Sequence, residues 1–324
     1  MAYQTGNANN LSDLLAKLAV FAQSLGWVVD KTESGSAPRL YLHNADGYWS
    51  LATGASGTFF YVVGNTGFDD SLAWDKQPGS SCVNHGFTTY YGAGTTELTG
   101  PYAGYDFLGT SRYLHVIVQP ASGRFRHFGL GTLIKEGDYT GGQYAFGTSI
   151  GKVYGGGLGN PSQDLNTYPF GDGCSLFNQS AYYVSAVRAD NLPGGEKSPR
   201  WYLCGSTTAG TGALGPGGAA DEPKNRAHPD ILSVITSQSV LGAAVSPVPF
   251  AILARSPDGL WRRLGTVPDM MVCHMTGIIP RSMHELAGEK WMIVPATQFR
   301  ESPDKVSDGG DNSWLLGYAY RVTE

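Results

Sequence analysis

The chain has 324 residues, enough for one large domain or two ordinary ones with a substantial core. Lys and Arg number 22 against 27 Asp and Glu, a formal charge of −5, and charged residues are 15% of the chain against about 25% on average. Gly 45 and Pro 18 make up roughly 19%, against about 12% in average usage, and aromatic residues are 12%. Disordered chains lack aromatics, and collagen needs a three-residue glycine period, so both classes are excluded. A folded, turn-dense, β-rich protein is expected.

The first predicted element is a helix near the N-terminus. Asn9 or Asn10 can cap it, Asp13 suits its first turn, and Gly26 is placed to end it. Its apolar residues follow the 3.6-residue period: Leu11, Leu14, Leu15, Leu18, Phe21, Ala22 and Leu25. We expect a one-sided amphipathic helix of about four turns. Its apolar face should pack on a sheet of the same lobe rather than on a partner chain.

Short β-branched and aromatic runs after Trp27 predict strands separated by glycine-containing turns. The first three form a meander, and a turn at 120–123 joins the next two as a hairpin. The predicted strands of this half are 39–43, 48–51, 58–63, 111–118, 124–128, 132–134 and 143–146. Towards the C-terminus we predict strands at 249–254, 260–264, 269–273, 290–294 and 315–320, with a possible second helix at 230–241.

These elements divide the chain into three parts. Residues 1–153 should hold the helix and an antiparallel β lobe, and residues 229–324 a β segment that completes the body. Between them, 154–228 is predicted to be a glycine-rich loop insertion, with strand character only at 179–187 and 201–204. The predicted fold class is mainly β (α+β), with antiparallel sheets in a sandwich-like body.

The charge pattern argues against nucleic acid or a membrane as a partner. The densest basic clusters, 124–127 and 261–263, hold two arginines each, too few for a phosphate track. No basic region followed by an apolar run opens the chain, so no secretory signal is expected. The uncharged stretch 231–254 could cross a bilayer by length. Its polar residues, with Pro247 and Pro249, predict a buried helix-turn-strand instead, so we expect no membrane span.

A GxSxG string at 147–151 is the strongest catalytic motif. In a hydrolase its serine, here Ser149, must sit on a tight turn from a strand into a helix. The glycine-rich sequence that follows cannot form that helix, and the parallel βαβ rhythm of a hydrolase is missing. Asp172 and His228 complete a Ser, Asp, His order, but seven histidines make such an order common. We interpret the string as a glycine-flanked turn.

The sequence also bears on nucleotide hydrolysis and on glycoside cleavage. A P-loop ending at Lys152 would need glycine and Ser or Thr where Phe146 and Val153 stand, so nucleotide hydrolysis is not predicted. Paired carboxylates for glycoside cleavage meet only in space, so a glycosidase stays open. We predict no catalytic residue and no cofactor-binding residue.

Metal binding is not predicted either. The cysteines form no CxxC pair, which excludes a zinc ribbon and favours reduced, buried thiols; they are Cys82, Cys174, Cys204 and Cys273. Cys273–His274 and His284–Glu285 are the only suggestive neighbours, and nine residues including Pro280 separate the pairs. An acidic loop lacks EF-hand spacing and favours a solvated surface; its carboxylates are Asp304, Asp308 and Asp311.

Large aromatic side chains in glycine-rich surroundings are typical of sheet cores and of recognition surfaces. We expect core packing for most of the prominent ones: Tyr90, Tyr91, Tyr102, Tyr105, Phe107, Tyr182, Tyr183, Trp201 and Tyr202. The long, weakly charged loops of 154–228 make poor solvated surface. They therefore predict contact with neighbouring proteins.

Several strings at both ends and in the middle of the chain carry a resemblance. They are LSDLLAKLAVFA at 11–22 with LGW at 25–27, GRFRHFGLGTLIK at 123–135, GDYTGGQY at 137–144, Trp261 with LG at 264–265, and GEKWMIVP at 288–295. These strings are similar to a family of virion structural proteins of tailed bacteriophages. The glycine-rich stretch 154–228 lies outside the resemblance.

The resemblance implies a non-enzymatic part of a phage particle, in the neck or collar, tail or baseplate. It implies a ring or other symmetric homo-oligomer that bridges neighbouring virion proteins and is assembled in the bacterial host cytoplasm. One alternative is a host-recognition or glycan-binding module at the tail tip, with the tyrosine-rich loops against cell-surface sugar. The second alternative is a serine or glycoside hydrolase.

Overall fold

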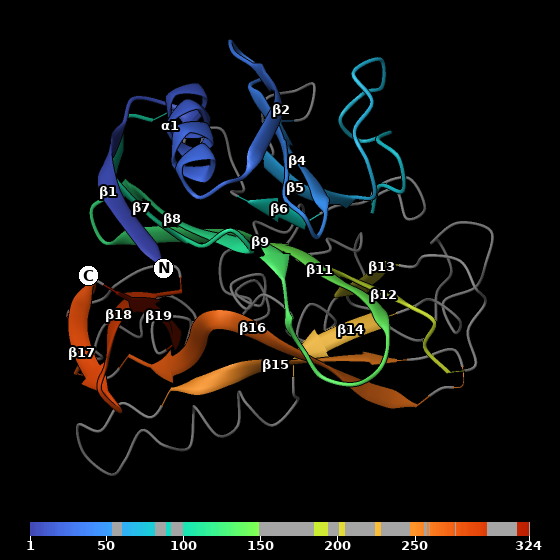
Figure 1. Ribbon diagram of the computed structural model, residues 1–324. Coiled ribbons are helices and arrows are strands. Elements are labelled where there is room, and N and C mark those ends of the chain that lie inside the picture. Colours follow the sequence, from blue (N-terminus) through green and yellow to red (C-terminus); the bar gives the residue numbers. More distant parts are fainter. Residues whose placement is uncertain are drawn as a thin grey trace, which may run out of the picture.

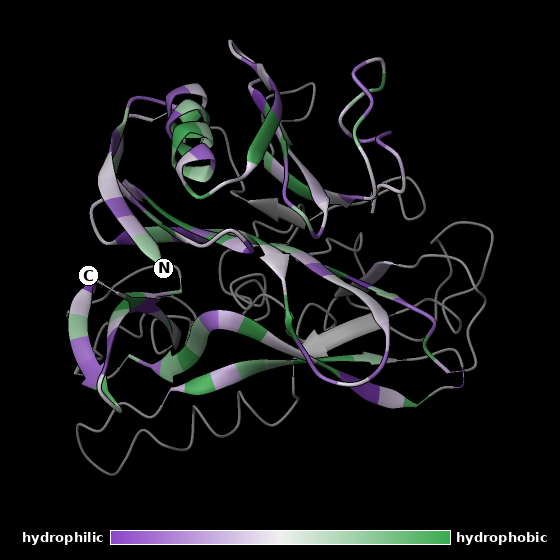
Figure 2. Cartoon of the chain, viewed as in Figure 1, coloured by the Kyte–Doolittle hydropathy of each residue, from purple (hydrophilic) through white to green (hydrophobic). Residues whose placement is uncertain are grey.

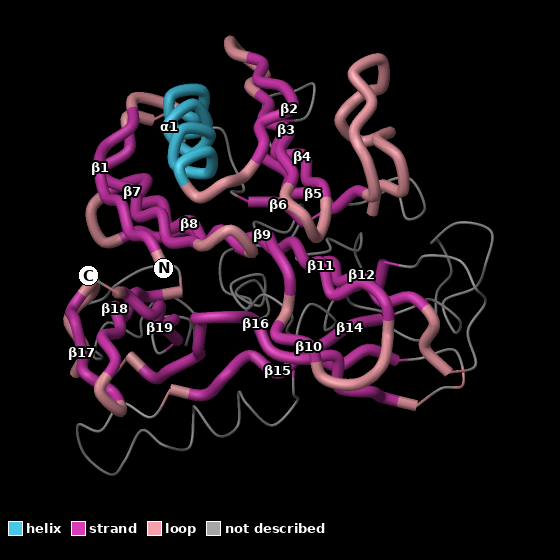
Figure 3. Tube along the Cα trace, in the orientation of Figure 1, coloured by secondary structure: helices cyan, strands magenta, loops and turns pink. Residues whose placement is uncertain are grey.

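The computed structural model describes residues 1–53, 60–81, 89–91, 100–148, 185–193, 201–204, 224–227, 247–255, 258, 260–275, 277–296 and 316–323. Within these ranges the protein is mainly β, as predicted, with antiparallel sheets and one helix, α1 (Leu11–Ser24). The tube view of Figure 3 shows how strands dominate the described chain.

Two sheets make up the body. The smaller has the order β2-β3-β4-β5-β6, and the larger runs β1-β7-β8-β9-β11-β12-β13-β14-β15-β16-β19-β18-β17, with β10 beside β16. The smaller sheet's bounds are β2 Val28–Glu33, β3 Arg39–His43, β4 Tyr48–Thr53, β5 Phe60–Asn65 and β6 Thr89–Tyr91. The larger sheet comprises β1 Ala2–Ala8, β7 Tyr102–Gly109, β8 Tyr113–Ala121, β9 Arg124–Thr132, β10 Ile134–Lys135, β11 Thr140–Gly147, β12 Ser185–Asp190, β13 Trp201–Cys204, β14 Lys224–Ala227, β15 Val248–Arg255, β16 Trp261–His274, β17 Ser282–Leu286, β18 Glu289–Pro295 and β19 Leu316–Val322.

The larger sheet folds over on itself, which gives the molecule three layers (Figure 1). The smaller sheet and α1 form the upper layer, strands β1, β7, β8, β9 and β11 the middle layer, and strands β14 to β19 the lower layer. Strands β12 and β13 carry the sheet round the bend. Strands from before residue 153 and after residue 229 therefore share one sheet.

Helix α1 begins and ends as its sequence dictates. The Asn10 side chain caps the N-terminus by accepting from the Asp13 amide. At the other end Gly26, with φ of 87°, donates to Gln23, while Trp27 donates to Ala22, the two bonds of a Schellman motif. The apolar stripe of the helix packs into the core that also contains Leu42, Trp49 and Phe107. Figure 2 shows the hydrophobic residues of α1 in green among its hydrophilic residues in purple.

The middle layer is buried on both faces because its strands alternate between two cores. Along β8, Leu114, Val116 and Val118 belong to the upper core, and Tyr113 and Ile117 to the lower core. A strand in this position buries the side chains on both of its faces. Each Å² of apolar surface that is removed from water stabilises the fold by about 25 cal/mol. The middle layer therefore holds the other two together.

A segment after β5, residues 66–81, covers the outer face of the smaller sheet. Phe68 packs on Tyr41 and Trp74 stacks on Tyr61, with ring centroids 5.3 and 4.9 Å apart. On the opposite, inner face Trp201 lies directly on Gly64, which is paired with the core residue Trp49, and an added Cβ would come within 2.0 Å of the indole. Only glycine permits that approach, so both faces of the smaller sheet are packed.

Six described strands were not predicted: β1, β2, β6, β7, β14 and β17. Within 154–228, where a loop insertion was predicted, the described residues form β12, β13 and β14, which link the middle and lower layers. The predicted helix at 230–241 lies outside the described residues.

Candidate functional site

The two edges of the folded sheet, β1 and β17, approach each other on one side of the molecule and are joined by a polar contact that we call the clasp. It consists of Tyr3, Thr5, Asp106 and Arg281. The Arg281 guanidinium donates to Asp106 Oδ1 at 2.6 Å and to Thr5 Oγ1 at 3.1 Å. The Tyr3 hydroxyl donates to the same Asp106 oxygen at 2.9 Å. The clasp thus ties the residue before β17 to β1 and β7.

The Asp106 carboxylate is 3% exposed, whereas the Arg281 side chain is 34% exposed. Burial and the Asp106 carboxylate together raise the pKa of the Tyr3 hydroxyl. Arg281 is held at φ of 63°, a left-handed conformation that costs a non-glycine residue free energy. The surrounding contacts must offset that cost, so the clasp is a specified feature of the fold.

A second junction lies near the clasp, around Asp269 of β16. Asp269 accepts from the Tyr113 hydroxyl and from Arg321 at 2.8 Å, and Arg321 also contacts Glu289 at 2.7 Å. Asp269 has φ of 53°, again left-handed. This junction connects β8 of the middle layer with three strands of the lower layer. It buttresses the same side of the molecule as the clasp.

The N- and C-terminal residues of the chain lie side by side (Figure 1). The Thr323 hydroxyl donates to the Met1 carbonyl at 2.6 Å, and the Met1 sulfur lies 3.0 Å from the Tyr113 hydroxyl. Three separate contacts therefore hold the middle and lower layers together at the side where the sheet does not close.

Behind these contacts lies a buried histidine-tyrosine cluster of His115, His127, Tyr144 and Tyr320. His115 Nε2 lies 2.8 Å from the Tyr144 hydroxyl, and His127 Nδ1 lies 2.9 Å from the Tyr320 hydroxyl. His127 Nε2 lies 2.8 Å from the Pro295 carbonyl and must be the protonated nitrogen, because a carbonyl can only accept. Tyr320 consequently donates to His127. This bond crosses from β9 in the middle layer to β19 in the lower layer.

Burial determines the protonation of this cluster. It lowers the pKa of both His115 and His127 to about 3, because an imidazolium loses its hydration there. Burial likewise raises the pKa of the Tyr144 and Tyr320 hydroxyls well above the usual value. All four side chains are therefore neutral near pH 7. Their geometry suits hydrogen bonding between layers rather than proton transfer to a substrate.

The edge strand β17 has a different character. It forms a hairpin with β18 through Ala287 and Gly288, whose φ values are 52° and 81°, as in a type I′ turn. Met283 is 51% exposed, and Ile279, shortly before the strand, is 73% exposed. Within the described residues β17 pairs with β18 alone. A rigid strand therefore presents an unpaired backbone edge beside exposed apolar side chains.

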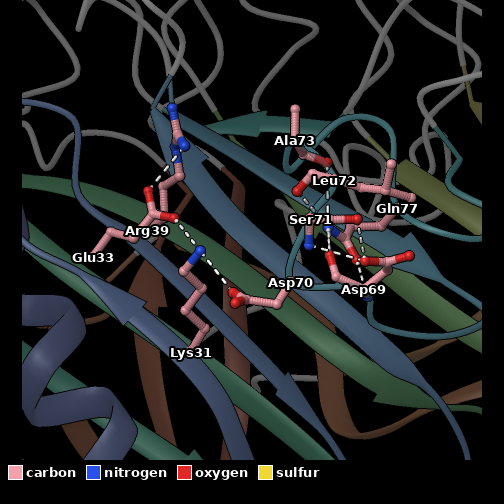
Figure 4. Close-up of polar contacts among 9 residues, drawn as sticks. All are labelled: Lys31, Glu33, Arg39, Asp69, Asp70, Ser71, Leu72, Ala73 and Gln77. Carbon is pink, nitrogen blue, oxygen red and sulfur yellow. Dashed lines mark hydrogen bonds and ion pairs between the residues drawn. The ribbon is translucent and has the colours of Figure 1, made fainter.

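Charged side chains form a second surface feature on the smaller sheet (Figure 4). Lys31 bridges Glu33 at 3.2 Å and Asp70 at 2.8 Å, and Arg39 contacts Glu33 at 2.9 Å. The Lys31–Asp70 pair fastens the segment 66–81 to β2, and the Arg39–Glu33 pair joins β3 to β2. Since they are solvent-exposed ion pairs, each contributes little to stability.

The fold of that segment depends on Gln77, which is 2% exposed. Its amide nitrogen donates to the carbonyls of Asp69, Leu72 and Ala73, and its oxygen accepts from the Asp69 amide (Figure 4). The Asp69 carboxylate accepts from the Ser71 amide and hydroxyl, which lowers the pKa of Asp69. The hydrogen bonds of this turn are thus satisfied internally.

The catalytic motifs from the sequence lie largely outside the described residues. These are Ser149, Lys152, Asp172 and His228, together with the acidic Asp304, Asp308 and Asp311. Phe146 of the P-loop-like string is fully buried in the lower core. The expectation that these strings are not catalytic stays a prediction.

The structure separates the other suggested metal ligands. Cys273 is buried, and burial raises the pKa of its thiol to about 12, which makes a thiolate ligand unfavourable. His284 on β17 lies 2.7 Å from the Ser282 hydroxyl. No group of three His, Cys, Asp or Glu suited to a metal occurs among the described residues.

The prominent aromatic residues fall into three groups. Tyr102, Tyr105 and Phe107 are buried in the upper core, and Trp201 and Tyr202 are also buried. Tyr90 and Tyr91 belong to β6. Tyr182 and Tyr183 lie outside the described residues.

Sequence reasoning missed the clasp because Asp106 and Arg281 lie 175 residues apart. The buried histidines did carry a signal. His115 and His127 sit inside runs predicted as strands, and His115 lies between the apolar Leu114 and Val116, whereas His127 follows Arg126.

No protein-family model matches the chain, and comparison with curated proteins gives no significant match. Among the described residues no helix is long and apolar enough to cross a bilayer.

Proposed function

We propose that the chain is a non-enzymatic structural component of a tailed phage particle. In this role it forms a symmetric oligomer and bridges neighbouring neck, collar or tail proteins. The proposal starts from the sequence resemblance to virion structural proteins. It is supported by where the resembling strings lie in the fold.

Those strings coincide with framework elements of all three layers. The first is helix α1, the central ones are β9, β10 and β11, and the last lie in β16 and β18. Their apolar residues belong to the cores, such as Leu18 in the upper core and Leu264 and Val294 in the lower core. A resemblance carried by packing residues favours a shared architecture over a shared catalytic site.

The chemistry of the described polar groups agrees with this role. His115 and His127 are neutral and bonded within the core, and Asp106 and Asp269 are committed to the clasp and its neighbouring junction. These groups fasten strands that lie far apart in sequence. Such internal fastening suits a protein that must keep its shape in an assembly.

Mass spectrometry of particles of a phage that encodes the chain tests the proposal. Gradient-purified particles should contain the chain at a fixed stoichiometry, and a mock preparation from uninfected cells should lack it. Absence of the chain from particles would overturn the proposal.

Antibody labelling of the same particles distinguishes the location. Label under the capsid or along the tail supports an assembly role in the neck or tail. Label confined to the distal tip, together with binding of the chain to host cells, would replace the proposal by host recognition. Glycoside or ester hydrolysis that Ser149→Ala or a carboxylate variant abolishes would replace it by an enzyme.

A further inference from the structure

The backbone of β17 has hydrogen-bonding groups directed away from its own sheet. The two-residue turn makes Leu286 and Glu289 the hydrogen-bonded pair that closes the hairpin. His284 and Trp291 are the next such pair, because bonded and non-bonded pairs alternate. The N–H and C=O groups of Met283 and Glu285 therefore point to the open edge.

The other edge of the same sheet is protected. Helix α1 packs beside β1, and Lys17 of that helix donates to the Asn7 carbonyl at 2.8 Å. At the start of β1 the Met1 carbonyl accepts from Thr323. A bulge between Gly6 and Ala8 also interrupts the strand. Cover, a lysine and a bulge are the devices that natural proteins use to prevent edge pairing.

Strand β17, Ser282–Leu286, has no lysine, no proline and no bulge against β18. Among the described strands, none pairs with its other edge. Its clasped start and tight turn keep it extended, so little conformational entropy is lost when another strand pairs with it. Met283 and Ile279 add exposed apolar surface next to the edge.

We infer that β17 is a self-association edge, at which the β17 strands of two copies of this chain pair antiparallel about a two-fold axis centred on His284. This inference deepens the proposed function by naming the contact through which the oligomer forms. In this register Met283 faces Glu285 of the other copy and Glu285 faces Met283. The outward N–H and C=O groups of both residues are then bonded, which gives four intermolecular hydrogen bonds.

Self-complementarity favours a second copy as the occupant. A two-fold axis matches each outward group with its complement on an identical strand. In this register each exposed Met283 lies opposite Glu285 of the other copy. The two Glu285 carboxylates therefore do not face each other across the contact. Pairing continues the larger sheet from one copy into the next.

A cysteine placed on the proposed axis tests the register. Across the axis His284 faces its own twin as a non-hydrogen-bonded pair, with Cα atoms about 4.5 Å apart, within disulfide range. His284→Cys in the full chain should give a covalent dimer under mild oxidation. Leu286→Cys is the matched control, since it lies roughly 13 Å along the strand from its twin in this register and should give little. Equal cross-linking of both variants, or none of His284→Cys, would overturn the register.

A glutamate placed on the edge tests the contact without cysteine chemistry. In light scattering coupled to size-exclusion chromatography the wild-type chain should be dimeric or larger. Met283→Glu should raise the dissociation constant about tenfold, because in this register each new carboxylate would lie opposite the Glu285 carboxylate of the other copy, and like charges that face each other across two strands are destabilising. Val20→Glu on α1 is the matched control, since Val20 is also an exposed apolar residue, and it should associate as the wild type does.

Two outcomes separate this inference from the proposed function. A monomeric wild-type chain, or equal association of Met283→Glu and wild type, removes self-association through β17. If the chain is still present in purified particles, the structural role stands without it. Association through β17 by a chain absent from particles keeps the edge contact and removes the virion role.

Discussion

Strands β1 and β17 are the two edges of one sheet, yet the fold treats them differently. β1 is covered by α1, and its terminal carbonyls accept from Lys17 and Thr323. Among the described strands β17 pairs with β18 alone, and Met283 is half exposed beside its other edge. The clasp and the buried histidine-tyrosine cluster fix the two edges relative to each other. Protection of one edge and exposure of the other is what an assembling subunit needs, because an unprotected pair of edges would aggregate without limit.

The largest expected effect on the free energy of unfolding comes from low pH. Protonation of His115 and His127 disfavours the buried cluster between the middle and lower layers, which carry the two edges. The pKa of His115 and of His127 is about 3 in the folded chain against 6.5 ordinarily. As pH falls the unfolded chain binds protons first, so stability is unaffected above about pH 7 and falls between about pH 6.5 and 3. The loss approaches about 1.4 kcal/mol per pKa unit for each histidine.

Chemical denaturation at a series of pH values measures this loss. His115→Gln should flatten the fall in unfolding free energy between pH 6.5 and 4, because it removes one of the two titrating groups. Val20→Ala, a surface variant on α1 that removes no titratable group, should leave the slope as in wild type. An identical slope in His115→Gln and wild type would contradict the account of the cluster.

Breaking the clasp should have the next largest effect. Asp106→Ala removes the acceptor of both Arg281 and Tyr3, and we expect a loss of about 2–3 kcal/mol in the free energy of unfolding. The control is Glu136→Ala, which breaks an exposed pair with Arg263 and should cost at most about 1 kcal/mol. Equal losses for the two variants, in urea denaturation, would show that the clasp is an ordinary surface pair.

Removing a side chain that protects the edge of β1 should have the smallest effect on stability. Lys17→Ala deletes the donor to the Asn7 carbonyl and an exposed pair with Asp13, which should cost about 0.5–1 kcal/mol. Because α1 still covers β1, the association constant should stay within about twofold of wild type. Light scattering checks this, with Lys76→Ala as the control for loss of an exposed lysine. New, larger oligomers in Lys17→Ala alone would show that this lysine is the main barrier at β1.

Local signals in the sequence explain most of the framework. The Asn10 cap, the 3.6-residue stripe and Gly26 predicted a helix in the place where α1 lies. The aromatic and β-branched runs predicted β3, β4, β5, β8 and β9, with boundaries shifted by a few residues. Each of these elements is specified by residues that are neighbours in the chain.

Three of the undetected strands, β1, β7 and β17, lack such signals. β1 has the sequence AYQTGNA and β17 has SMHEL, and neither shows the apolar alternation by which a half-buried strand is recognised. β7 mixes glycine with aromatic residues and reads as a turn-rich stretch. The candidate site is built from these strands. Its central pair, Asp106 and Arg281, meets only through the topology of the sheet.

Concentration-dependent hydrogen exchange tests the central claim most directly, because it reads the outward amides of β17 themselves. The account predicts that the Met283 and Glu285 amides of the wild-type chain exchange quickly when dilute and slow at least about tenfold as concentration rises through the association range. Exchange in β1 should be independent of concentration. Protection that grows at β1, or exchange at β17 that is the same at every concentration, would contradict the claim that β17 is the open edge through which the chain associates.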